Sequence, residues 1–190
     1  MIRPNYARSP LGFTLIETVM VAALAACLMI AVGLLILMFG KISSYDRAVS
    51  LSSGSATAVM HELGSLVLPA DAVISSRAFG GTTYTSSASV LVLEIPSIDS
   101  SGAVISSTYD YAVFYVSGTS AYRILSVNAS SKRASGTKLL SSTINSLSFA
   151  YNNTDASQVD TVTADVQTRI QVKQDVVSDH RSGQFQLRNH

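Results

Sequence analysis

The sequence lacks most of the patterns that mark an enzyme or a metal-binding protein. Its only cysteine is Cys27, so the chain can form no internal disulfide and a cysteine-based zinc site is excluded. His61-Glu62 is not followed by a second histidine four residues after the first, which excludes the helical zinc-protease motif. No phosphate-binding P-loop and no dinucleotide-binding glycine pattern is present. These absences predict a protein that is not an enzyme, needs no cofactor and holds no metal.

Charge of one sign is not in excess either. With 13 basic and 12 acidic residues the formal net charge is +1, so the overall charge does not point to nucleic acid or to an acidic substrate. Asp155, Asp160 and Asp165 recur at a spacing of five. On a strand this spacing alternates between the two faces, so these aspartates are not expected to converge on a calcium ion.

Three basic residues lie close together in a Ser/Gly-rich loop: Lys132, Arg133 and Lys138. The simplest interpretation is a solvated loop. The alternative is a contact for DNA or for lipid headgroups, which three charges would support only as a weak, salt-sensitive attraction. Nucleic acid is therefore not the expected partner, and this loop is the place where it would bind.

Charged residues and proline are also missing from Thr18 to Gly40. A helix over this stretch, rising about 1.5 Å per residue, is long enough to cross the ~30 Å hydrocarbon core of a membrane. It is apolar on all sides, which is typical of a helix surrounded by lipid or by other helices. Glu17 stands at the front edge of the run, where an ionisable group costs free energy in lipid and so points to function. Within the run, Ala22 and Ala26 offer small residues for close helix packing.

The residues around Glu17 resemble a known family. The chain reads Gly12-Phe13-Thr14-Leu15-Ile16-Glu17, after a short leader that contains Arg3 and Arg8 and no acidic residue. This order of basic leader, glycine, phenylalanine, glutamate and apolar run resembles the type IV pilin superfamily, which includes the pseudopilins of type II secretion. The pattern of the last hundred or so residues is also similar to minor pilins and J-type pseudopilins.

The resemblance implies a processing and assembly pathway. A prepilin peptidase would cut between Gly12 and Phe13, the new amine of Phe13 would be methylated, and Glu17 would act in assembly. The implied partners are other pilin or pseudopilin subunits, the inner-membrane assembly platform and membrane lipid. The chain is expected to cross the inner membrane once, with its N-terminus in the cytoplasm and its head outside, and then to enter a pilus or pseudopilus filament. The missing disulfide favours a minor subunit.

The expected fold class is α+β, and the expected organisation has four parts. Residues 1–12 are the leader peptide, 13–40 the transmembrane and assembly helix, 41–64 an amphipathic continuation of that helix, and 65–190 a β-rich globular head. The continuation is predicted from apolar residues on one helix face, with Gly64 as its end. The long helix, whose first half is transmembrane, is expected to pack on an antiparallel sheet, as in pilins.

The head is expected to consist of successive strands with tight turns. The predicted strands cover residues 90–95, 109–116, 122–127, 144–151 and 159–172, and a short last strand lies near Phe185 and Leu187. Pro96 is expected to end the first of these strands. Residues 66–84 are expected to be mainly loop, with room for a short strand at 72–75.

Other interpretations of the apolar run compete with this one. Leu24-Ala25-Ala26-Cys27 fits a bacterial lipobox, but the apolar run continues from Leu28 to Phe39, whereas a secretory signal ends at its cleavage site. A signal-peptidase site at residues 23–25 fails for the same reason. A single-pass, membrane-anchored surface or binding protein that never enters a filament is the alternative function. A methylated Phe13 at the mature N-terminus would support the pilin, and an intact Met1 would support the static anchor.

Overall fold

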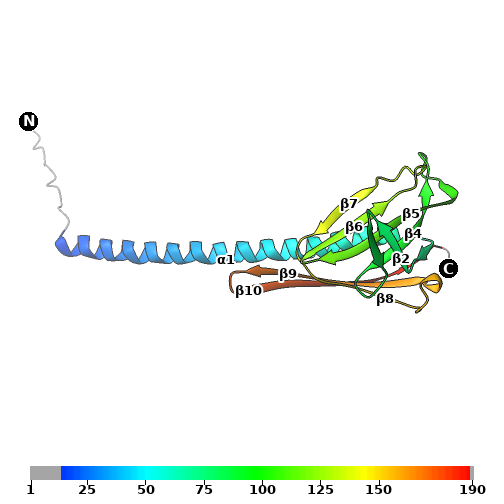
Figure 1. The fold of residues 1–190 in the computed structure, drawn as a ribbon. Coiled ribbons are helices and arrows are strands. Elements are labelled where there is room, and N and C mark those ends of the chain that lie inside the picture. Colours follow the sequence, from blue (N-terminus) through cyan, green and yellow to red (C-terminus); the bar gives the residue numbers. More distant parts are fainter. Residues whose placement is uncertain (1–13, 189–190) are drawn as a thin grey trace, which may run out of the picture. The chain divides into compact units, whose positions relative to one another are not determined.

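The computed structural model describes residues 14–188 (Figure 1). The chain divides into two compact units, residues 1–44 and 45–190. Helix α1, Leu15–Val67, supplies the described part of the first unit and the opening segment of the second, and every described strand belongs to the second unit. All named strand pairs are antiparallel. The predicted α+β class, a long apolar N-terminal helix with antiparallel sheets, is confirmed.

The second unit contains, besides the end of α1, three sheets with strand orders β1-β4-β5-β6-β7, β10-β9-β8 and β2-β3. The strands of the five-stranded sheet are β1 (Ala72–Val73), β4 (Leu91–Ile98), β5 (Val104–Ser117), β6 (Ser120–Ser126) and β7 (Gly136–Ser141). Those of the three-stranded sheet are β8 (Ile144–Tyr151), β9 (Thr161–Val172) and β10 (Asp175–Gln186). The small hairpin is β2 (Ser76–Phe79) with β3 (Thr82–Thr85), and a 3-10 helix, η1 (Ala156–Gln158), precedes β9.

The main core of the second unit lies where the two larger sheets meet the end of α1 (Figure 1). The buried side chains of α1 recur mostly every three or four residues, as one face of a helix requires; they are Ala48, Ser52, Ala56, Val59, Leu63, Leu66 and Val67. Those from Ala56 onward belong to this core. Alternate residues of the strands close the core, for example Leu91 and Leu93 on β4 and Val162 and Ala164 on β9. No described residue before Ala48 is buried.

Residues 66–84 are not mainly loop, because 76–85 form the β2–β3 hairpin. Gly80 and Gly81, with φ of +54° and +88°, make the turn in a conformation that other residues rarely adopt. The hairpin covers the face of β4 and β5 that is turned away from α1. There Phe79 is buried with Val92 and Val113 in a second, smaller apolar cluster.

Two residues expected to interrupt the elements do not interrupt them. Strand β4 continues past Pro96 to Ile98, with a register shift between these two residues. Strand β1 pairs with Leu93 and Glu94 of β4 and does not reach Pro96. At Pro96, β4 therefore has a neighbouring strand on one side only, and on the open side the missing N–H of proline is tolerated. Helix α1 likewise continues past Gly64 to Val67.

Strand β10 is 12 residues long, and not the short strand expected near Phe185 and Leu187. It lies close to α1 because two glycines leave room. A Cβ atom at Gly64 would come within 3.2 Å of the Phe185 ring, and a Cβ atom at Gly183 would overlap the methyl group of Met60. Gly64 is therefore a close-packing position and not a helix stop.

Candidate functional site

Glu17 lies in the first turn of α1, where it caps the helix. Its Oε2 accepts a hydrogen bond from the Thr14 backbone N–H (2.9 Å) and another from the Thr14 hydroxyl (3.0 Å), and Thr14 Oγ1 accepts one from the Glu17 N–H (3.4 Å). This reciprocal arrangement is a capping box, which satisfies donors that the start of a helix otherwise leaves unpaired. The other oxygen, Oε1, has no hydrogen-bond partner within the described chain. Gly12 and Phe13, the expected cleavage and methylation residues, lie outside the described residues.

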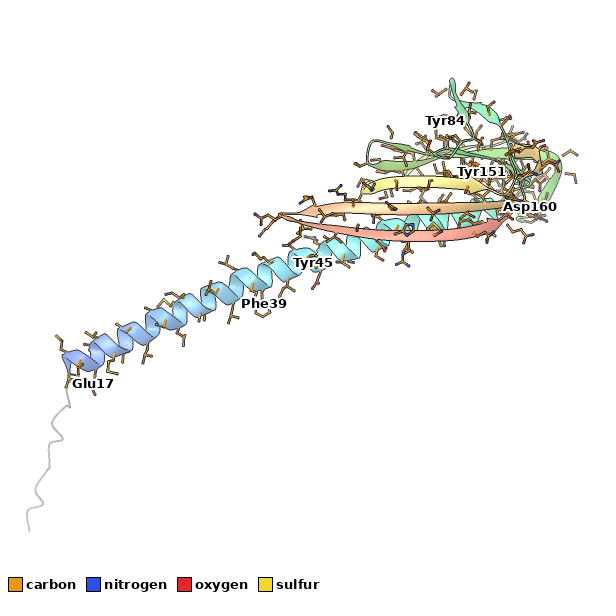
Figure 2. All side chains as sticks on the ribbon, turned by 90° about the horizontal axis from the view of Figure 1, so that it is seen from below. Glu17, Phe39, Tyr45, Tyr84, Tyr151 and Asp160 are labelled. Atoms are coloured by element: carbon orange, nitrogen blue, oxygen red, sulfur yellow. The ribbon has the colours of Figure 1, made fainter. Side chains whose placement is uncertain are left out.

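The apolar part of α1 exposes its side chains on every side. All residues from 14 to 47 are exposed, and Leu28 and Phe39 each expose 68% of their surface. Figure 2 shows these side chains projecting all round the helix between Glu17 and Phe39. Within residues 14–188, α1 is the single helix that is long and apolar enough to be a candidate membrane span. So large an apolar surface needs lipid or other helices around it.

Ala22 and Ala26 lie one turn apart on this exposed helix, so their small side chains share one face. A second helix can approach the backbone closely at such a face. Cys27 follows directly and is also exposed, so it adjoins this face as a small apolar residue.

Arg133 is not a free cation, because it pairs with a carboxylate in the interior. Asp110 on β5 is fully buried and lies 2.8 Å from Arg133 Nη1. Its Oδ1 accepts hydrogen bonds from the Ser97 hydroxyl and the Asn128 N–H (both 2.9 Å), and its Oδ2 accepts one from the Ser131 hydroxyl (2.6 Å). Burial by itself raises the pKa of Asp110, but these hydrogen bonds outweigh it and leave the pKa below its ordinary value. The group fastens the loop after β6 to the sheet.

Lys138 is paired as well. It lies on β7, and its Nζ is 2.6 Å from Oε2 of Glu62 on α1, whose Oε1 is 3.1 Å from Arg123 Nη2. Burial raises the pKa of Glu62, but the two cations outweigh it and hold the pKa below its usual range. The structure therefore does not gather the three basic residues into one free patch. Only Lys132 is exposed without a described side-chain partner.

The aspartates spaced by five also have separate surroundings. Asp155 caps η1 by accepting from the Ser157 N–H (3.0 Å), Asp160 accepts from the Asn152 side chain, and Asp165 lies 3.3 Å from His180 Nε2. Among residues 14–188, no three His, Cys, Asp or Glu side chains are placed to hold a metal ion. Asp110 is the one fully buried carboxylate in this range, and its hydrogen bonds give it a structural role.

Sequence reasoning did not identify two of these features. The Thr14-x-x-Glu17 spacing is the known signature of a capping box and was readable from the sequence. The Asp110 site carries a weaker signal, an acidic residue inside the apolar, aromatic stretch of residues 109–116. Its partners come from two separate segments, β4 and the loop after β6, so they could not be read from the local sequence. No protein-family model, curated protein or solved structure matches this chain.

Proposed function

We propose that this chain is a pilin-like structural subunit, a minor component of a type IV pilus or a type II secretion pseudopilus. One observation carries the proposal. Residues 15–40 form a helix that is apolar on all sides with a single carboxylate, Glu17, in its first turn, and no described residue before Ala48 is buried. A helix that is exposed and apolar on all sides is available for a membrane first and for other subunits later.

The proposed sequence of events starts in the inner membrane. Prepilin peptidase removes the leader after Gly12, and the freed amine of Phe13 is methylated. The apolar helix holds the subunit in lipid until the assembly platform transfers it to the filament, where neighbouring helices replace the lipid. Ala22 and Ala26 are the positions at which those helices approach closely.

Glu17 gives this transfer its specificity. An unpaired carboxylate costs about 2.5–3.5 kcal/mol at the centre of a membrane and less near its edge. Surrounded by helices in a filament, Glu17 needs a positive partner, and residues 18–40 contain none. The amine created before Phe13, on the same or a neighbouring subunit, supplies that charge. A subunit out of register would leave both charges unpaired in a low-dielectric environment, so this pair fixes the axial register.

The mature N-terminus tests the proposal directly. Purified from its native membrane, the protein should begin at a methylated Phe13. Gly12→Val should leave the leader attached, because a branched side chain at the cut obstructs the peptidase where glycine offers no obstacle. Mass spectrometry of the intact chain distinguishes these species. An intact Met1 in the wild type would support the static membrane anchor instead, and a chain starting at Phe13 despite Gly12→Val would overturn the cleavage assignment.

A further inference from the structure

The outer face of the three-stranded sheet carries a polar hollow that the proposed assembly does not use. Figure 2 views this sheet with α1 behind it, so the face toward the reader is turned away from the helix. The hollow has a volume of about 450 Å³, within the range of about 300–1,000 Å³ that is usual for small-ligand sites. Its lining includes Asn145, Gln167, Arg169, Val176, Ser178 and His180.

A β-bulge places Asn145 in the hollow. The pairing of β8 with β9 shifts register between Ile144 and Ser146. As a result Ile144 and Leu147 are buried, whereas Asn145 and Ser146 are both exposed, which breaks the one-in, one-out alternation of a regular strand. Bulges of this kind redirect a side chain and are common beside functional sites.

The register of β9 with β10 brings the remaining polar side chains together. Arg169 lies opposite Ser178, and Gln167 lies opposite His180. Residues directly opposite on antiparallel strands share a face and have neighbouring side chains. Strands β8, β9 and β10 thus contribute two side-chain amides, a hydroxyl, an imidazole and a guanidinium. Val176, which is 45% exposed, adds an apolar surface at the edge.

Among the described residues, the charges around the hollow leave one cation without a hydrogen-bond or ion-pair partner. Asp179 accepts from Arg181 Nε (3.2 Å) and from the His180 N–H (3.0 Å), and Asp165 lies 3.3 Å from His180 Nε2. Each acid therefore already has a partner. The exposed guanidinium of Arg169, in contrast, has no hydrogen bond or ion pair within the described part of the chain.

We propose that this hollow binds an anionic, hydroxyl-rich ligand: a sugar that carries a carboxylate or a phosphate. Arg169 binds the acidic group, since a guanidinium matches both carboxylate and phosphate oxygens with paired donors. Asn145 and Gln167 bind the hydroxyl groups, because an amide both donates and accepts hydrogen bonds. The inference is independent of filament assembly and concerns the head alone.

The test uses full-length protein in detergent micelles and two matched ligand pairs, galacturonate with galactose and glucose 6-phosphate with glucose. Calorimetric or NMR titration should show saturable binding of at least one acidic sugar and at least about tenfold weaker binding of its neutral counterpart. Which acidic sugar binds tells whether a carboxylate or a phosphate is preferred. Arg169→Gln should weaken binding at least about tenfold, and Asn145→Ala should weaken it several-fold.

The matched control is Lys173→Gln, which removes one positive charge from the turn of the same hairpin, outside the hollow. It should leave the affinity unchanged. Thermal unfolding of each variant checks the fold, and Asn145→Ala provides the test if Arg169→Gln fails to fold. Absence of saturable binding, equal affinity for neutral and acidic sugars, or equal weakening by Lys173→Gln and Arg169→Gln would each overturn the proposal.

Discussion

The two parts of α1 differ in which side chains they bury, although they form one continuous helix. In residues 15–44 the apolar side chains surround the helix and all are exposed. In residues 45–67 a stripe from Ala48 to Val67 is buried, and the opposite face carries small and polar residues such as Ser50, Gly54 and Thr57. A helix with one apolar stripe is matched to the core of its own domain, and a helix apolar on all sides is matched to surroundings that the chain does not supply.

The largest expected effect on stability comes from comparing one leucine substitution in each part of α1. Leu63→Ala removes a fully buried side chain and should lower the free energy of unfolding of the head by about 2–5 kcal/mol. Leu34→Ala, the matched change in the exposed part, should leave it unchanged. Thermal unfolding of both variants in the same detergent checks this. A similar loss for Leu34→Ala would mean that the first part of the helix also stabilises the head.

The second effect concerns the buried carboxylate of the head. The pKa of an Asp side chain in the unfolded state is about 3.9. In the folded state the pKa of Asp110 is lower. Its carboxylate therefore stabilises the fold fully above about pH 4, and this contribution is lost as pH falls through the folded-state pKa. Asp110→Asn should cost about 2–3 kcal/mol at pH 7, because it leaves Arg133 without a counter-charge.

The cost of Asp110→Asn should shrink as the pH falls below about 4. Glu62 shifts in the same direction, so the wild type will lose stability in acid for both reasons and the comparison must be the difference between wild type and variant. Urea unfolding at a series of pH values measures that difference. If the difference in unfolding free energy between wild type and Asp110→Asn stayed constant from pH 7 to pH 3, the stabilisation would not come from the ionised carboxylate.

A smaller effect on stability should distinguish Lys138 from Lys132, the two exposed lysines among the three basic residues. Lys138→Met removes an ion pair that joins β7 to α1 through Glu62, and it should lower stability by roughly 0.5 kcal/mol, the size expected for a largely exposed pair. Lys132→Met removes a charge of the same sign with no described partner and should change nothing. Equal effects of the two variants on urea unfolding would contradict the role assigned to Glu62.

Sequence reasoning succeeded where periodicity was strong. Residues 144–151 form β8 with the predicted bounds, and the hairpin around residues 117–120 is present because apolar and aromatic residues flank a tight turn. It failed where an element has few apolar residues. On the inner side of β10, Asp179, Arg181 and Gly183 replace apolar side chains, because this strand packs at the margin of the core and Gly183 touches Met60. Strand β7 was likewise missed, because it directly follows the Ser/Gly-rich loop and contains Lys138. The position of Lys138 is explained by its ion pair with Glu62, which lies far away in the sequence.

The candidate residues of the first unit followed from the sequence alone, because they depend on local order: a glycine, a phenylalanine and a glutamate before an apolar run. The structural role of Arg133 could not be predicted, since it depends on Asp110, which lies far away in the sequence. The same limit applies to the hollow at Asn145. Only the strand register reveals that its side chain joins those of Arg169 and His180.

The most direct test of the central claim is the entry of a Glu17→Gln variant into filaments. Glutamine at this position still closes a capping box with Thr14, so the helix start is preserved while the charge is removed. Thr14→Ala is the complementary control, since it weakens the cap and keeps the charge. The measurement is the ratio of the protein in sheared filaments to that in membranes. We expect Glu17→Gln to be inserted and cleaved normally yet to enter filaments poorly, and Thr14→Ala to enter them normally. An unchanged ratio for Glu17→Gln would contradict the claim and leave Glu17 as a helix cap alone.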